Sequence, residues 1–167
     1  MAYEGARVQL RSFSFAMGLL LINGCTSIKD ISDESPYRET IGQCYVLQQD
    51  MQIWENSAGC WEIGDLILSP HTSHYCATKS KADIPKGTEI TIIAVKERWQ
   101  WGTGACAQLV LAIPGIDISG RNVSPPVCFS RPSLNWNEEL VWFRGDEIQL
   151  KKEYVKPCES TPERSSH

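Results

Sequence analysis

The sequence has few of the motifs that mark catalytic or metal sites. None of its seven cysteines is spaced as Cys-x-x-Cys, which disfavours zinc ribbons and thioredoxin-type redox sites. It also has no glycine-rich nucleotide loop, no serine nucleophile elbow and no metalloprotease helix motif. These absences argue against an enzyme, and they indicate neither a cofactor nor a metal.

Charge of one sign is not concentrated anywhere along the chain. Its 16 basic and 20 acidic residues give a net charge of −4, and no block of like charge occurs. Proteins that bind nucleic acid generally carry a basic face or tail. A nucleic-acid partner is therefore disfavoured.

The longest apolar run near the N-terminus is too short to cross a bilayer. It covers the eleven residues 12–22 and follows Arg7 and Arg11, whereas a spanning helix needs about 20 apolar residues. A basic start, a short apolar stretch and small residues after it are typical of a secretory signal. An apolar N-terminal helix with a buried cysteine and a plain secretory signal are the alternatives.

The end of this run is Ile22-Asn23-Gly24-Cys25, which resembles the lipobox of bacterial lipoproteins. The resemblance implies cleavage before Cys25 and acylation of its sulfur and new amino group, giving a membrane anchor. Residue Thr26 follows the cysteine, where an aspartate would retain such proteins in the inner membrane. The resemblance thus implies the outer membrane, with the domain facing the periplasm.

We expect four parts in the chain. Residues 1–24 are the signal peptide, and 25–36 are the lipidated cysteine and a flexible, polar, acidic tether. Residues 37–158 form a single β domain, and 159–167 form a disordered tail. Removal of 1–24, which carries a net charge of +1, leaves a chain near −5 that is long enough for one domain with a core.

The remaining cysteines are even in number and widely spread. An exported chain with this pattern is expected to contain three disulfides, although six cysteines allow 15 pairings. The six are Cys44, Cys60, Cys76, Cys106, Cys128 and Cys158.

Short extended segments separated by turn residues predict an all-β domain. No stretch keeps the helical period for three turns. The β-rich segments are 43–55, 61–69, 87–99 and 105–113, with a hairpin over 138–152.

The clearest strand lies in 87–99. Ile90 and Ile92 alternate with polar residues, and the phase then slips at Ile93, which predicts a β-bulge or burial on both faces. Before it, residues 84–87 predict a type I turn with proline second and glycine fourth.

This turn and strand, "IPKGTEITII", resemble the small SH3-like barrels of bacterial envelope proteins. The resemblance covers about residues 40–113 and implies an SH3-like or related partly open barrel with disulfide-pinned loops. Residues 114–136, rich in proline, glycine and serine, extend beyond that pattern and are expected to form a long loop pinned at Cys128.

Two clusters of residues could carry chemistry or binding. His71, His74 and Cys76 include zinc-ligand types, but Cys76 is needed for a disulfide, so we expect no metal site. Trp99 and Trp101 share one side of a strand and could form a platform for a glycan or a proline-rich peptide. The alternative is that the six tryptophans fill the core.

The sequence favours a non-enzymatic lipoprotein whose β domain binds an envelope protein or peptidoglycan. The alternative is a periplasmic inhibitor of a lytic enzyme such as lysozyme, with residues 114–136 as the loop that would plug the enzyme's cleft.

Overall fold

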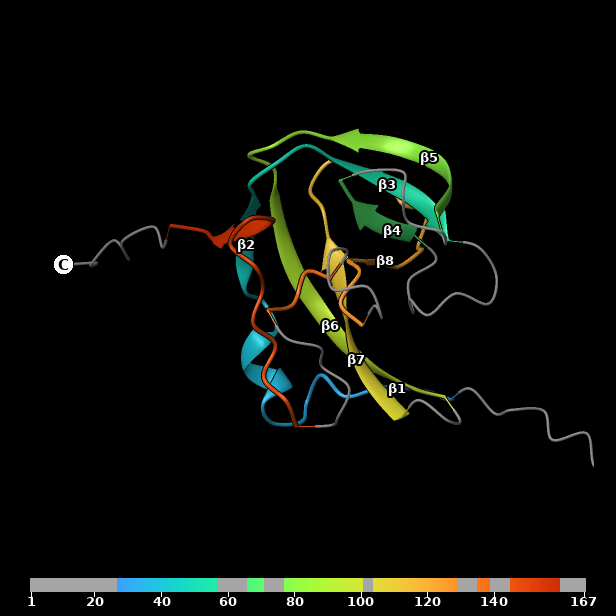
Figure 1. The fold of residues 1–167 in the computed structure, drawn as a ribbon, viewed down its shortest axis with the longest axis vertical. Helices are drawn as coiled ribbons and strands as arrows, with labels where there is room; N and C mark the ends of the chain where they lie inside the picture. Colours follow the sequence, from blue (N-terminus) through green and yellow to red (C-terminus); the bar gives the residue numbers. More distant parts are fainter. Residues whose placement is uncertain are drawn as a thin grey trace, which may run out of the picture.

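The computed structural model describes residues 27–56, 66–70, 77–100, 104–128, 135–138 and 145–159, and these parts of the chain are all-β. Their strands form one open, mixed sheet in the order β5-β3-β4-β8-β7-β6-β2-β9, and β1 pairs with β6 outside this path (Figure 1). The strands are β1 (Ser27–Asp30), β2 (Cys44–Leu47), β3 (Met51–Asn56), β4 (Leu66–Ser69), β5 (Ala77–Ile84), β6 (Glu89–Gln100), β7 (Gly104–Ala112), β8 (Val123–Ser124) and β9 (Val155–Pro157). A single 3₁₀ turn, η1 (Tyr37–Thr40), is the helical element of the described residues. The predicted all-β class is confirmed.

The long strand β6 organises half of the sheet. Its partner along one side is β7, whereas its other side pairs first with β2 and then with β1 (Figure 1). Strand β2 also pairs with β9, which forms the edge of the sheet on this side. In the other half, β3 lies between β4 and β5, and a parallel pairing of β4 with β8 joins the two halves.

The phase slip in β6 is a β-bulge. The β6–β7 register shifts between Ile92 and Ala94, so Ile93 is the extra residue and its side chain is 51% exposed. Ile90, Ile92 and Val95 are buried on either side of it. The predicted bulge is therefore confirmed, and it lets Ile92 before it and Val95 after it both reach the core.

The core draws on nearly every strand of the sheet. Trp136 and Tyr154, both buried, stack with ring centroids 5.5 Å apart. The largest fully buried side chains are Trp136, Tyr37, Ile31, Leu47, Met51, Ile53, Ile67, Leu68, Ile84, Ile90 and Ile92. Strand β4 is buried at all four positions, so it lies inside the fold on both faces.

The turn before β6 is one residue later than predicted. The Thr88 N–H donates to the Pro85 carbonyl at 3.2 Å, which places Gly87 third in the turn with φ of +89°. A positive φ at the third position is the requirement of a type II turn, which glycine meets without strain. The type I assignment is therefore wrong, because Gly87 serves the left-handed position rather than the turn's end.

The segment predicted to be a flexible tether is part of the sheet from Ser27 onward. Strand β1 pairs antiparallel with residues 96–99 of β6, and the next residue, Ile31, is 1% exposed. The tether prediction for 25–36 is corrected here: its described part is an edge strand and a turn. All four β1 side chains are exposed, which explains why the composition resembles a linker.

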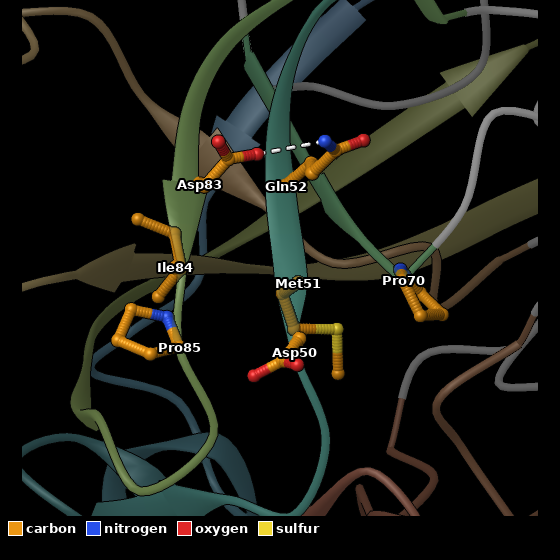
Figure 2. A pocket seen from close by; sticks show the side chains of 7 residues that line it. All are labelled: Asp50, Met51, Gln52, Pro70, Asp83, Ile84 and Pro85. Carbon is orange, nitrogen blue, oxygen red and sulfur yellow. Dashed lines mark hydrogen bonds between the residues drawn. The ribbon is translucent and has the colours of Figure 1, made fainter.

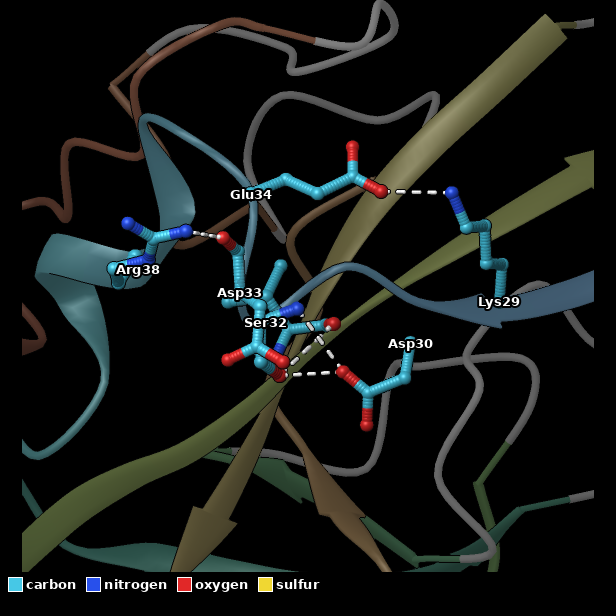
Figure 3. Close-up of polar contacts among 7 residues, drawn as sticks. Lys29, Asp30, Ser32, Asp33, Glu34 and Arg38 are labelled. Atoms are coloured by element: carbon cyan, nitrogen blue, oxygen red, sulfur yellow. Dashed lines mark hydrogen bonds and ion pairs between the residues drawn. The ribbon is translucent and has the colours of Figure 1, made fainter.

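Polar contacts fix the turn after β1 (Figure 3). Asp30 Oδ1 accepts hydrogen bonds from the Ser32 N–H at 3.0 Å and the Ser32 hydroxyl at 2.6 Å. The same hydroxyl accepts the Val95 N–H at 2.9 Å, which connects the turn to β6. Lys29 pairs with Glu34 at 2.7 Å, an exposed pair of small energetic value.

Two disulfides are present in the described residues. Cys44–Cys158 joins β2 to the segment after β9, with Cα atoms 5.4 Å apart. Cys106–Cys128 joins β7 to residue 128, with Cα atoms 6.1 Å apart, and both cysteines are buried. Cys60 and Cys76 lie outside the described residues.

The predicted hairpin over 138–152 is described only in part. Glu138 N–H donates to the Gln149 carbonyl at 2.8 Å, and Asn137 and Leu150 form an isolated antiparallel bridge. The two arms thus lie side by side, while residues 139–144 lie outside the described residues. No helix of the described chain is long and apolar enough to cross a membrane.

Candidate functional sites

The first candidate site is the end of the three-stranded ribbon β1–β6–β7, where apolar side chains are exposed. We call residues Ser27, Ile28, Arg98, Trp99 and Ala105 the ribbon tip. Its Ile28 is 57% exposed and its Trp99 is 39% exposed. With Ile93, they are the large apolar side chains exposed among the described residues.

The register places these two side chains on opposite faces of the ribbon. Ser27 lies opposite Trp99, and Ile28 lies opposite Arg98. Directly opposed residues share a face, and successive residues alternate. Trp99 therefore lies on the face that carries the core residues Val95 and Leu109, beyond the covered part, and Ile28 lies on the other face.

The ribbon tip is also where the chain enters the domain. Cys25 precedes Ser27 by two residues, so their Cα atoms are at most about 7 Å apart along an extended chain. Chain length alone gives this bound, because Cys25 itself lies outside the described residues.

The tryptophans do not behave as one group. Trp54 and Trp136 are buried, at 7% and 0% exposure, and contribute to the interior. Trp99 is exposed, while Trp101, its predicted companion, lies outside the described residues, as do Trp61 and Trp142. The platform of Trp99 and Trp101 therefore stays a prediction, because Trp101 is outside the described residues.

The second candidate site is a groove between the start of β3 and the end of β5 (Figure 2). Its volume is about 460 Å³, within the usual range of small-ligand and side-chain pockets. Accessible apolar surface comes from Pro70 and Pro85, because Met51 and Ile84 are each only 1% exposed, and polar groups come from two aspartates and a glutamine. The described lining residues are Asp50, Met51, Gln52, Pro70, Asp83, Ile84 and Pro85.

Hydrogen bonds hold both carboxylates of this groove in place. Gln52 Nε2 donates to Asp83 Oδ1 at 2.7 Å, across the β3–β5 register pair (Figure 2). The Lys86 N–H donates to Asp50 Oδ1 at 2.8 Å. No basic side chain is among the described lining residues, so the groove has the charge and apolar contacts suited to an alkyl-ammonium or guanidinium group.

Sequence reasoning missed this groove. Asp50 and Asp83 are far apart in the chain and come together only through the pairing of β3 with β5. Isolated aspartates beside strand residues carry no local motif. The signal that could have found them is the sheet topology, which the sequence did not specify.

Carboxylates with shifted pKa values in the described residues belong to structural contacts. Hydrogen bonds from Ser32 lower the pKa of Asp30, and the hydrogen bond from Lys81 lowers that of Glu55. Glu55 also lies 3.4 Å from Arg121. Both shifts favour the ionised form, whereas a general acid needs a raised pKa.

The described cysteines and acids form one geometric cluster of potential metal ligands. Ligand atoms of Cys44, Cys158 and Glu89 lie within 4.8 Å of one another. The two sulfurs are joined in a disulfide, so neither can bind a metal as a thiolate. His71, His74 and Cys76 lie outside the described residues.

The predicted loop 114–136 is partly built into the fold. Val123 and Ser124 form β8, and all residues from 123 to 128 are buried. The disulfide to Cys106 pins the segment at Cys128, as predicted. Exposed residues of the described part are confined to 114–120, with Ile116 and Ile118 partly buried.

Comparison of the chain with protein-family models, with curated proteins and with solved structures gives no match. The function proposed below therefore depends on the sequence and on the two candidate sites.

Proposed function

We propose that the protein is a non-enzymatic lipoprotein of the outer membrane, facing the periplasm, whose β domain binds an envelope partner. Cleavage before Cys25 removes residues 1–24, and the acylated cysteine anchors the chain. The lipobox-like Ile22-Asn23-Gly24-Cys25 carries this proposal. The proposal includes an SH3-like fold for residues 40–113, because their sequence resembles SH3-like envelope domains.

The position of β1 supports an anchor that holds the domain close to the bilayer. Because β1 begins at Ser27, two residues after Cys25, the link between lipid and domain is short. The start of β3 and the end of β5, which line the groove, lie at the other end of the molecule from β1 (Figure 1). A domain anchored through Cys25 would thus present the groove away from its own attachment point.

The two carboxylates of the groove favour a cationic ligand group, which a basic segment of an envelope protein supplies. Asp50 and Asp83 supply two carboxylates beside the accessible Pro70 and Pro85. We propose that this groove accepts a lysine or arginine side chain from a basic segment of an envelope protein. Trp99, the binding residue expected from sequence, pairs with Ser27 of β1 at the opposite end of the molecule from the groove.

The test compares two charge reversals in the anchored, full-length protein. Asp83→Lys places a cation in the groove, and Asp146→Lys changes an exposed aspartate outside it. A photoreactive amino acid at the exposed Lys86, whose contact to Asp50 is made by its backbone N–H, should crosslink to one envelope protein, and Asp83→Lys should abolish that product while Asp146→Lys preserves it. Equal crosslinking in both variants, or binding only to isolated peptidoglycan sacculi, contradicts the groove assignment.

The inhibitor alternative has less surface available than the sequence suggested. An inhibitor needs a protruding loop, and the burial of 123–128 leaves 114–120 as the exposed described part. Slowing of lysozyme by the purified protein, lost when 114–120 is shortened while the fold persists, would establish this alternative.

A further inference from the structure

We propose that the ribbon tip is a membrane-contacting surface, with Trp99 and Ile28 in the lipid headgroup layer beside acylated Cys25. The inference rests on the proposed lipid anchor and adds a second, non-covalent attachment to it. It assigns to Trp99 a lipid contact in place of the partner contact expected from sequence.

The first argument is that apolar exposure occurs on both faces of the ribbon at one end. Trp99 points to one face and Ile28, one register pair away, points to the other. A docked protein covers the face that it contacts and leaves the opposite face in water. A headgroup layer surrounds the tip of a ribbon and can accept side chains from both faces.

The second argument is distance. The headgroup and interfacial region is roughly 5–8 Å thick on each side of the hydrocarbon core. Cys25, whose acyl chains enter that core, is at most about 7 Å along the chain from Ser27. Ser27 lies directly opposite Trp99, where neighbouring Cβ atoms are about 5 Å apart. Together these lengths keep Trp99 within roughly 12 Å of Cys25, so its ring can reach the headgroups that cover the acyl chains.

The third argument is the chemistry of the side chain. Tryptophan has a large apolar ring system with one N–H donor, and it concentrates where a membrane meets water. Ile28 is exposed on a strand whose other side chains are a serine, a lysine and an aspartate. An exposed isoleucine beside a lipidated cysteine gains favourable burial when the tip enters the interface.

Ile93 provides a matched internal control. It lies on the same strand as Trp99, is 51% exposed and is apolar, but it occupies the bulge away from β1. Exposure alone would make Ile93 and Trp99 equivalent, whereas proximity to the anchor distinguishes them.

The experiment places a benzophenone amino acid at position 28, 93 or 99 of the full-length chain in a Gram-negative host. Membranes are irradiated, and each protein is analysed by mass for phospholipid and protein adducts. Positions 28 and 99 should both give phospholipid adducts, several-fold more than position 93. The mass of the peptide that begins at Cys25 is measured in the same samples.

Three results would overturn the inference while Cys25 is found acylated: protein adducts in place of lipid at position 99, equal lipid adducts at all three positions, or no lipid adducts at 28 and 99. The first would return Trp99 to a partner surface. A Cys25 without acyl mass would instead remove the anchor, and the proposed function would fail together with this inference.

Discussion

Ser27 lies directly opposite Trp99 in the antiparallel register that joins β1 to β6. This pairing connects the start of the domain, two residues after the lipobox-like cysteine, with an exposed tryptophan near the end of a twelve-residue strand. The domain consequently has two distinct ends. One carries the predicted anchor and the ribbon tip, and the other carries the acidic groove.

The segment after β1 should contribute strongly to stability. Ile31→Ala removes a side chain that is 1% exposed, and such truncations typically cost about 2–5 kcal/mol. Ile28→Ala, at a side chain that is 57% exposed, should change the free energy of unfolding of the soluble domain by about 0.5 kcal/mol or less. Urea titration of both variants checks this. If both substitutions lowered the free energy of unfolding by equally small amounts, the segment would be a flexible tether as first predicted.

The disulfide between Cys44 and Cys158 should stabilise the whole domain. It closes a loop with a sequence separation of 114, and long loops of this kind are worth roughly 5 kcal/mol in the chain-entropy account. Paired Cys44→Ser and Cys158→Ser substitutions should lower the free energy of unfolding by about 2–5 kcal/mol. A urea midpoint unchanged from wild type would show that β9 is held without the bridge.

The third disulfide should join Cys60 to Cys76. Four of the six cysteines are already paired, and the register brings Asn56 opposite Ala77, each a few residues from one remaining cysteine. Peptide mapping without reduction should recover the two cysteine peptides as one linked species. Free thiols at both positions, or a bridge to any other cysteine, would contradict this pairing.

Acid should remove a contribution made by Asp30. The hydrogen bonds from Ser32 lower its pKa in the folded protein, below the usual value of about 3.9 that holds in the unfolded chain. Its stabilising effect is thus present above about pH 4 and is lost as the pH falls through the lowered value.

Asp30→Asn should therefore reduce stability at about pH 7 and reduce it less at about pH 2. Urea midpoints of the variant and the wild-type protein are compared at both pH values, and the gap between the two midpoints should narrow at the lower pH. Asp146→Asn, at an exposed position, serves as the matched control and should show no such narrowing. An unchanged gap for Asp30→Asn would mean that the Ser32 contacts do not stabilise the ionised form.

Local sequence patterns predicted the features that depend on neighbouring residues. The alternation at Ile90 and Ile92 and the slip at Ile93 predicted the bulge, because side-chain phase is a property of one strand. The same reasoning located most segments that contain strands. It failed at β1, where an edge strand with four exposed residues has no apolar alternation, and at β5, whose first half was expected to be a polar loop and whose described side chains are mostly exposed.

Features that depend on pairing could not be obtained this way. Residues 43–55 contain both β2 and β3, yet β2 pairs with β6 and β9 while β3 pairs with β4 and β5. Because β3 pairs with β5, Asp50 and Asp83 line the same groove. The position of Gly87 in its turn also depends on pairing. Its N–H donates to the carbonyl of Leu47, which is distant in the sequence, so neighbouring residues alone did not predict the turn correctly.

The intact mass of the protein extracted from membranes, before and after reduction, tests the central claim most directly. The account predicts a chain that begins at Cys25, carries added acyl mass and gains two hydrogen atoms for each of three disulfides on reduction. A chain that keeps residues 1–24, carries no acyl mass and gains nothing on reduction would contradict both the lipid anchor and the export on which the proposed function depends.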